Sequence, residues 1–221
     1  DSDHEIGKKA LERVKTMLLT EGDALSDKSS IKCAVSTYIG GPTLRGILER
    51  IQWVFEEANV LAVENFYDYS TTKYQVVLGC LEELRARPEL FISDEKAISV
   101  VLRELEISCH LNIASGCLEM QRNYMKGLNH CDQVLNLDSS HAVCHFRKGQ
   151  LYQALHNYDK ALASLGTAKS LLSGVEGEQR SDEQQKSMLA TVDKEIDKCN
   201  FARHQYDIKY LRSLATAQTT K

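Results

Sequence analysis

The stretch VCHFRKGQLYQALHNYDKALASLGTAKSLL, from Val143 to Leu172, decides the expected fold. Its small and aromatic residues follow one another at spacings of 3, 6, 3, 7 and 3, in the order Gly149, Tyr152, Tyr158, Ala161, Ala168 and Leu171. These spacings fit a helix-turn-helix unit with a period of about 34 residues. Glycine and alanine are needed where two helices approach closely, because a larger side chain would hold their backbones apart. The stretch therefore predicts two packed helices.

A weaker form of this pattern recurs earlier in the chain. Counting back 34 residues from Tyr158 reaches Tyr124, and Gly127 follows at the small position of the helix crossing. Counting back 50 more residues reaches Tyr74, which opens a more degenerate unit. We therefore predict an all-α solenoid of three repeats, at about 43–87, 94–138 and 140–172. A helical extension over residues 1–42 precedes the repeats, and a long capping helix over 178–221 follows them.

Composition agrees with a helical chain. The 221 residues include two prolines and 7% aromatic residues, fewer chain breakers and β-formers than strand-rich domains usually contain. Periodicity predicts helices at about 3–19, 29–38, 94–120 and 181–217. In the first repeat it predicts one helix from Thr43 to Tyr69 and its partner from Lys73 to Ala86, ending before Pro88.

Charge and sorting features narrow the class of partner. The net charge of −4 and a pI near 6.0 give no electrostatic attraction toward nucleic acid. No run of about 18 apolar residues is present, so we expect no membrane span, and no secretory signal is visible. The seven cysteines form no CxxC pair, which favours reduced thiols packed in a core and predicts a cytoplasmic protein.

No pattern of catalytic chemistry stands out. The sequence has no phosphate-binding glycine loop and no HExxH or GxSxG motif, so we predict no enzyme, no catalytic residues and no cofactor. The cluster of His130, Cys131, His141, Cys144 and His145 has donor types suited to zinc. Cys131, Cys144 and His145 fall at helical positions that such repeats bury, so we expect core packing and no metal.

Four segments specify the repeat further: Leu111–Ala114, His130–Leu135, Leu137–Ser139 and Phe146–Gly149. They resemble the tetratricopeptide repeat (TPR) domains of FKBP-type immunophilins and of their aryl-hydrocarbon-receptor-interacting co-chaperone relatives. The resemblance implies a groove, made by the first helix of each repeat, that holds a peptide of a protein partner. Residues 1 to about 55 match no part of an FKBP isomerase domain, so we expect no proline isomerase activity.

Many such domains bind the acidic C-terminal tail of heat-shock chaperones through a carboxylate clamp. By resemblance, the clamp uses a lysine and an asparagine on the first groove helix, an asparagine on the second, and a lysine and an arginine on the third. The third helix keeps Arg147 but has Val143 in place of its lysine. The second keeps Asn112, provided that the turn before Tyr124 contains one extra residue.

Counting back from Tyr74 puts Ala62 and Phe66 at the clamp positions of the first groove helix. Two of five clamp residues would then remain, so we expect weak or no binding of chaperone tails. Local roles are the alternative: Asn112 can bond to backbone, and Arg147 can pair with an acid such as Glu119. The candidate groove comprises Asn112, Arg147, Val143, Phe146, Gln150, Ala62 and Phe66.

The leading interpretation is a non-catalytic adaptor that binds a peptide or helix in this largely apolar groove. A second is a working co-chaperone in which Lys73 or Lys148 completes the clamp. A third is a structural protein that oligomerises through its terminal helices. The last helix carries four cationic side chains, but interleaved acids favour a solvated face there: Arg203, His204, Lys209 and Arg212.

Overall fold

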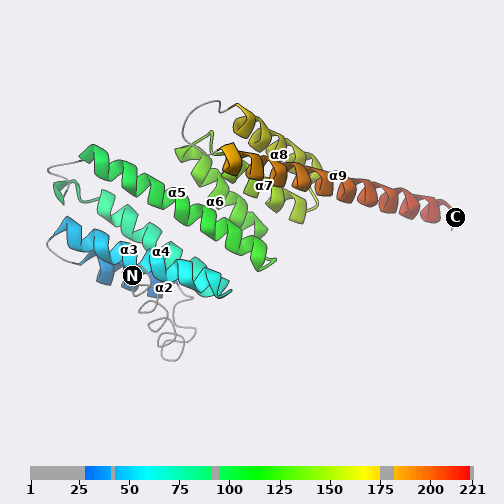
Figure 1. Ribbon diagram of the computed structural model, residues 1–221. Coiled ribbons are helices and arrows are strands. Elements are labelled where there is room, and N and C mark those ends of the chain that lie inside the picture. The colour runs from blue at the N-terminus through cyan, green and yellow to red at the C-terminus, as the bar shows by residue number, and fades with distance from the viewer. Residues whose placement is uncertain (1–27, 41–42, 91–94, 175–181, 220–221) are drawn as a thin grey trace. The chain divides into compact units, whose positions relative to one another are not determined.

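The computed structural model describes residues 28–40, 43–90, 95–174 and 182–219, and all regular structure in these ranges is helical (Figure 1). An all-α chain was predicted. The helices are α2 (Lys28–Ile39), α3 (Leu44–Val63), α4 (Tyr67–Arg85), α5 (Glu95–Glu119), α6 (Tyr124–Leu137), α7 (Ala142–Ala154), α8 (Tyr158–Ser173) and α9 (Asp182–Thr219), with a short 3-10 turn at Pro88–Leu90. The predicted helix at 3–19 lies outside the described residues. Among the described residues, no helix is both long and apolar enough to cross a bilayer.

The chain divides into two compact units, 1–120 and 121–221, and each is described by itself. The second predicted repeat, 94–138, spans the boundary between them. The repeat and domain ranges therefore stay predictions, whereas the helices at 29–38, 94–120 and 181–217 are confirmed to within two residues at either end.

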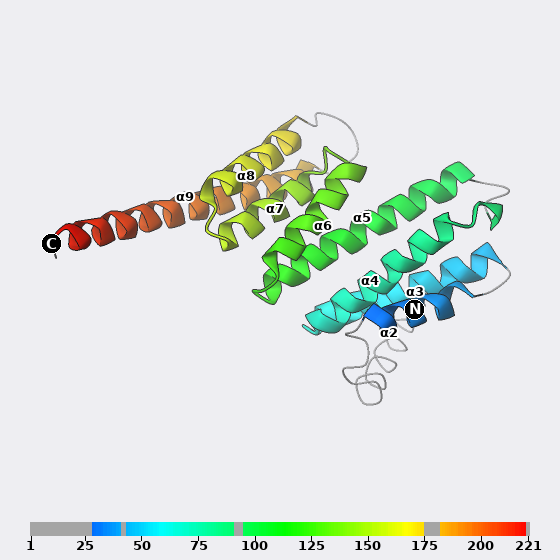
Figure 2. The same cartoon turned by 180° about the vertical axis from the view of Figure 1, so that it is seen from behind.

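In the first unit, α4 packs against α2, α3 and α5 (Figure 2). The buried residues of α3 recur every three or four positions, so one face of the helix is apolar: Ile47, Ile51, Val54, Ala58 and Leu61. Thr43 starts the helix, because its hydroxyl accepts a hydrogen bond from the Gly46 backbone amide. At Gly79 of α4, an added Cβ would lie 2.8 Å from Val35 of α2, so glycine permits this helix contact.

The turns between α3 and α4 and between α7 and α8 are built alike. Each has three residues, and the middle one, Asn65 or His156, has a positive φ of 65° or 58°. The backbone hydrogen bonds follow the same pattern in both turns. In the first turn, the amides of Glu64, Asn65 and Phe66 donate to the carbonyls of Val60, Ala62 and Leu61, respectively. In the second, the amides of Leu155, His156 and Asn157 donate to the carbonyls of Leu151, Gln153 and Tyr152. The sequences of the two helix pairs can therefore be aligned without a gap, with Asn65 equivalent to His156.

This equivalence corrects the predicted register of the first repeat. The helix expected to run to Tyr69 ends at Val63, and its partner begins at Tyr67 rather than Lys73. Tyr67, not Tyr74, is the equivalent of Tyr158, a shift of seven residues. Seven residues make almost two full turns of a helix, so both registers present nearly the same apolar face, and periodicity does not separate them.

The second unit contains the helices α6 to α9, and α7 and α9 both pack on α8. Its core joins Phe146 of α7 to residues of α8 and α9, including Leu165, Val192 and Cys199. Capping of the last repeat by the final helix was predicted, and the burial of Val192 and Cys199 against this core agrees with it. A Cβ added to Gly149 would lie 2.6 Å from Cγ of Leu165, which confirms the predicted close crossing.

The connection between α5 and α6 has four residues, 120–123, one more than in the two turns described above. This confirms the extra residue on which the position of Asn112 depends. With it, Asn112 stands seven residues before the end of α5, just as Arg147 stands seven before the end of α7. The two side chains occupy equivalent positions on their helices.

Candidate functional site

A cluster of amide and phenol groups joins three helices of the first unit. The side-chain oxygen of Asn59, on α3, accepts a 2.6 Å hydrogen bond from the hydroxyl of Tyr74, on α4. The same oxygen accepts a 3.4 Å hydrogen bond from the amide nitrogen of Asn112, on α5. The sequence-based alternative of a backbone partner for Asn112 is therefore wrong, because its amide bonds to another side chain.

Tyr74 is the buried member of this cluster, with 1% of its surface exposed. Burial raises the pKa of Tyr74 to about 12, since it outweighs the lowering effect of side-chain hydrogen bonds with Ser70 and Asn112. The phenol thus remains a neutral hydrogen-bond donor at physiological pH. Its ring also packs against Phe55, with 5.8 Å between ring centroids, so its position is held from two sides.

The amide nitrogen of Asn59 is the group that this cluster leaves available. Asn59 is half-buried, and no other described residue accepts a hydrogen bond from its amide nitrogen. Because its oxygen is occupied by Tyr74 and Asn112, the amide orientation is set, and two N–H donors remain for a ligand. Sequence reasoning missed Asn59. The register that begins from Tyr67 instead of Tyr74 would have identified Asn59. It moves the two clamp positions back by seven residues, from Ala62 and Phe66 to Phe55 and Asn59.

Ala62 and Phe66 lie elsewhere than expected. Ala62 is in the last turn of α3, and Phe66 is the residue before α4, with its ring partly exposed. Neither side chain takes part in the hydrogen bonds of the amide cluster among the described residues. The first groove helix ends before Phe66, so this side chain is at the turn rather than on the helix face.

In the second unit, α7 carries the predicted groove residues Val143, Phe146, Arg147 and Gln150. Arg147 donates a 3.0 Å hydrogen bond to the side-chain oxygen of Gln150, and its guanidinium lies 5.9 Å from the ring centroid of Phe146. Its partners in the described structure are therefore an amide and a ring, and an ion pair with Glu119 is not among them. Val143 and Arg147 are half-buried. By the matched turns, Gln150 is the counterpart of Asn59.

Phe146 is not a groove residue. Only 5% of its surface is exposed, and it belongs to the core that α7, α8 and α9 form together. Its prediction as a concave-surface residue is wrong, because the face of α7 on which it lies is covered by helices that follow it in the chain. Through its ring, Phe146 instead supports the guanidinium of Arg147.

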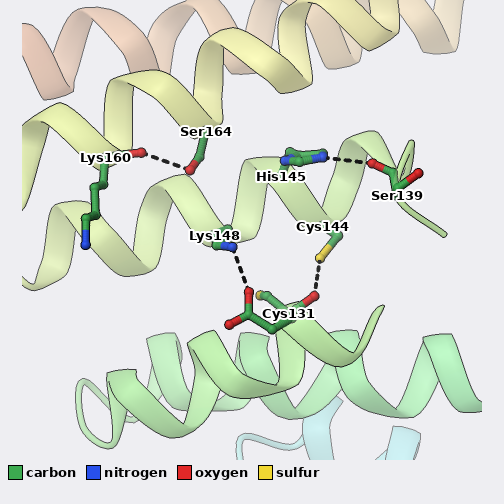
Figure 3. A network of polar contacts seen from close by, with 8 residues as sticks. Cys131, Ser139, Cys144, His145, Lys148, Lys160 and Ser164 are labelled. Atoms are coloured by element: carbon green, nitrogen blue, oxygen red, sulfur yellow. Dashed lines mark hydrogen bonds and ion pairs between the residues drawn. The ribbon is translucent and has the colours of Figure 1, made fainter. Parts of the chain in front are cut away.

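The two lysines that were alternative clamp residues are held in ion pairs. Lys73 lies 3.4 Å from Glu57, and both side chains are buried between α3 and α4. Lys148 lies 2.7 Å from Asp132 of α6 (Figure 3). Burial lowers the pKa of Lys148, but the hydrogen bond and charge of Asp132, with smaller contributions from Tyr152 and Cys131, together raise it by more. Neither ammonium group is therefore free to complete a clamp.

The cysteines are core residues, as expected, with one exception. Six are buried and Cys33 is exposed. Cys144 donates a hydrogen bond to the Cys131 carbonyl oxygen at 3.2 Å (Figure 3), and its proximity, together with burial, raises the pKa of Cys131. Such thiols are poor nucleophiles and poor metal ligands.

The histidines of the suspected zinc cluster have other contacts. His141 caps α7 by accepting from the Cys144 amide, and His145, which is half-buried rather than buried, contacts the Ser139 carbonyl at 3.1 Å. Within the described ranges, no three histidine, cysteine or acidic side chains converge on a metal position.

Known proteins are similar to parts of the chain, among them the following two. The Hsp70/Hsp90 co-chaperone cns1 of Schizosaccharomyces pombe is 41% identical over 59 residues, which cover 27% of this chain and 16% of that protein. The peptidyl-prolyl cis-trans isomerase FKBP4 of Bos taurus is 29% identical over 116 residues, which cover 52% of this chain and 24% of that protein. The chain thus spans about a quarter or less of either relative, and no family model matches it.

Proposed function

We propose that this protein is a non-catalytic adaptor of the TPR type, which binds a peptide segment of a partner protein through amide donors on its groove helices. The observation that carries the proposal is the Asn59–Asn112 pair, whose orientation is set by the buried hydroxyl of Tyr74. A hydrogen-bond donor that is held in place before binding loses little entropy when a carboxylate or peptide carbonyl reaches it.

The clamp residues of the resemblance are kept in part. With the corrected register, Asn59, Asn112 and Arg147 occupy three of the five clamp positions, and Phe55 and Val143 stand where the two lysines would be. The donor types kept at these positions are therefore amides in the first unit and a guanidinium in the second, with no ammonium group. The two apolar replacements favour a peptide that also carries aliphatic or aromatic side chains.

A second candidate function is co-chaperone binding of the acidic tail of a heat-shock chaperone. Two observations favour it: the similarity to the Hsp70/Hsp90 co-chaperone cns1, and the third clamp residue, Asn59, that the corrected register adds. The missing lysines argue for low affinity, because they would supply most of the positive potential that two carboxylates need. Assembly through the terminal helices, the third interpretation, stays a prediction.

Calorimetric titration with a peptide ending in Met-Glu-Glu-Val-Asp tests the proposal. A free C-terminal carboxylate should bind, and the amidated peptide should bind at least about tenfold more weakly, as expected when charge-assisted hydrogen bonds of about 1.5 to 3 kcal/mol are lost. Asn59→Ala and Arg147→Ala should each weaken binding, whereas Asn136→Ala, which removes an exposed amide on α6, should not.

The outcomes separate the two candidates. Binding that falls steeply with added salt favours a chaperone tail held mainly by charge. Binding of Leu- and Phe-containing peptides, with weak salt dependence and a negative heat-capacity change, favours the apolar groove. If Asn59→Ala and Arg147→Ala leave the affinity for both kinds of peptide unchanged, the proposed site is wrong.

A further inference from the structure

A cavity of about 630 Å³ lies wholly within the second unit, where α9 passes the turn between α7 and α8. This volume is within the usual range of ligand pockets, about 300 to 1,000 Å³. The large side chains among its lining residues include His156, Tyr158, Phe201, Tyr206, Lys209 and Tyr210. None of them belongs to the proposed groove, so the cavity is a separate site.

An aromatic box forms one wall of the cavity. Tyr206 of α9 stacks on His156, with 6.3 Å between ring centroids and 17° between ring planes, and it meets Tyr158 at 5.8 Å and 59°. His156 is in turn 3.1 Å from the Tyr158 hydroxyl and has the positive φ of the turn. The three rings therefore come from two segments of the chain and hold one another in position.

Two further contacts set the position of α9 against the start of α8. Cys199 is completely buried in the second-unit core, and Arg203 pairs with Asp159 at 3.2 Å. These residues are two turns and one turn of the helix before Tyr206, so they fix which side chains of α9 face the turn. The cavity is thus a feature of the packed helices and does not depend on an exposed loop.

Along this stretch α9, which continues past α8 (Figure 1), leaves large apolar side chains open to solvent. Phe201, Tyr206 and Tyr210 are 67%, 51% and 58% exposed. Isolated exposed aromatic residues are ordinary, but several that line one cavity make a contiguous apolar surface typical of a docking site. Tyrosine suits such a surface, because its ring packs while its hydroxyl can still bond to water or to a ligand.

Charge selects the kind of occupant. Lys209 is the one residue of fixed charge in the lining, and no carboxylate lines the cavity. The ion pairs among the described residues do not include Lys209. Between positions 200 and 213, α9 has Arg203, Lys209 and Arg212 against the single acid Asp207, and Arg203 already pairs with Asp159 of α8. A second copy of this chain, docked α9 to α9, would bring another Lys209 and no lining carboxylate, which disfavours it relative to an acidic partner.

We propose that this cavity is a second peptide-binding site, which takes an acidic segment of a partner protein with a leucine or aromatic side chain as its anchor. The anchor packs between the Tyr158–Tyr206 ring pair and Phe201, and an acidic side chain of the segment pairs with Lys209. The site works independently of the amide cluster in the first unit.

Selection of binders from a random displayed peptide library tests the proposal on the full chain. Peptides enriched on the unmodified protein should combine aspartate or glutamate with leucine or an aromatic residue. Their affinity should fall about tenfold or more with Tyr206→Ala, as for aromatic hot spots, and also fall with Lys209→Glu. Lys194→Glu, a change earlier on α9, and Arg147→Ala, in the groove, should leave it unchanged.

Three results would overturn the proposal. In the first, the library gives no enriched peptides, or only peptides that are basic or uncharged. In the second, neither Tyr206→Ala nor Lys209→Glu weakens the binding of the enriched peptides. The third is a mass in light scattering that rises with protein concentration and returns to the monomer value in Tyr206→Ala, because a second copy would then fill the cavity. Lys209→Glu changes an exposed side chain, so it keeps the test valid if Tyr206→Ala loosens α9.

Discussion

The hydroxyl of Tyr74 donates a 2.6 Å hydrogen bond to the side-chain oxygen of Asn59, fifteen residues earlier in the chain. Tyr74 is completely enclosed and Asn59 is only half-buried, so a buried group sets the direction of a group that solvent can reach. Tyr74 is thus a positioning residue, and Asn59 is the one available to a ligand.

Replacing Tyr74 with phenylalanine should separate these two roles. We expect Tyr74→Phe to lower the free energy of unfolding by about 1 kcal/mol, the usual value of one hydrogen bond. We also expect it to weaken peptide binding, although Tyr74 itself does not contact the peptide. Urea denaturation and calorimetric titration measure the two effects. Tyr210→Phe, which removes an exposed hydroxyl from α9, is the control. Unchanged peptide affinity in Tyr74→Phe would show that Asn59 needs no such support.

Two glycines on neighbouring helices should respond to alanine in opposite directions. Gly149→Ala puts a Cβ 2.6 Å from Leu165, and we expect a loss of about 1 to 3 kcal/mol in unfolding free energy. A Cβ added at Gly166 of α8 would meet no neighbouring atom within 4 Å, so Gly166→Ala should stabilise the helix by about 0.5 to 1 kcal/mol. Thermal melts compare them, and a destabilised Gly166→Ala would contradict this packing.

The buried Glu57–Lys73 pair should be costly to break from one side. Lys73→Met removes the cation that pairs with the buried carboxylate of Glu57, and we expect the free energy of unfolding to fall by about 3 to 5 kcal/mol. The double change Glu57→Leu with Lys73→Met should destabilise less than the two single changes added together. Denaturant titrations of the four proteins give the coupling energy.

Lys148→Met is the control for this ion pair. Its partner Asp132 is more than half exposed, so we expect a loss below about 1 kcal/mol. Equal effects of Lys73→Met and Lys148→Met would contradict the burial of the first pair.

Alkaline solution should destabilise the first unit. Burial raises the pKa of Tyr74 from 10.0, and that of Cys80 from 9.0, to about 12 in each case. The unfolded chain releases these protons first, so the stabilisation is complete below about pH 9 and is lost as the pH rises toward 12. Each group contributes at most about 1.4 kcal/mol per pH unit. Urea midpoints measured between about pH 8 and 11 should fall.

Substitutions show whether these two groups cause the fall. Tyr74→Phe and Cys80→Ala should each flatten the decline above the ordinary pKa of the group that is removed. An unchanged slope in both variants would mean that other groups govern the alkaline loss.

The sequence by itself determined the helical class, the second-unit helix pair and the Gly149 crossing. These features depend on residues close together in the chain: a small residue at a crossing, a tyrosine after a turn, an apolar stripe that repeats every three or four positions. It also placed Asn112 and Arg147 on their helices, once one extra residue was allowed before Tyr124. Local spacing is enough for such features, because helix geometry ties each side chain to neighbours three and four residues away.

Only the tertiary structure decided the register of the first repeat and the residues open to a ligand. A seven-residue shift keeps nearly the same helix face, so the pattern fitted Tyr74 as well as Tyr67, and Asn59 was passed over for Phe66. Phe146 was predicted as a groove residue, but it is enclosed in a core that α7 shares with α8 and α9, which follow it in the chain. The aromatic box of His156, Tyr158 and Tyr206 likewise exists because α9 packs across a distant turn. Which surface a later helix covers is a property of packing, and no local pattern in the sequence encodes it.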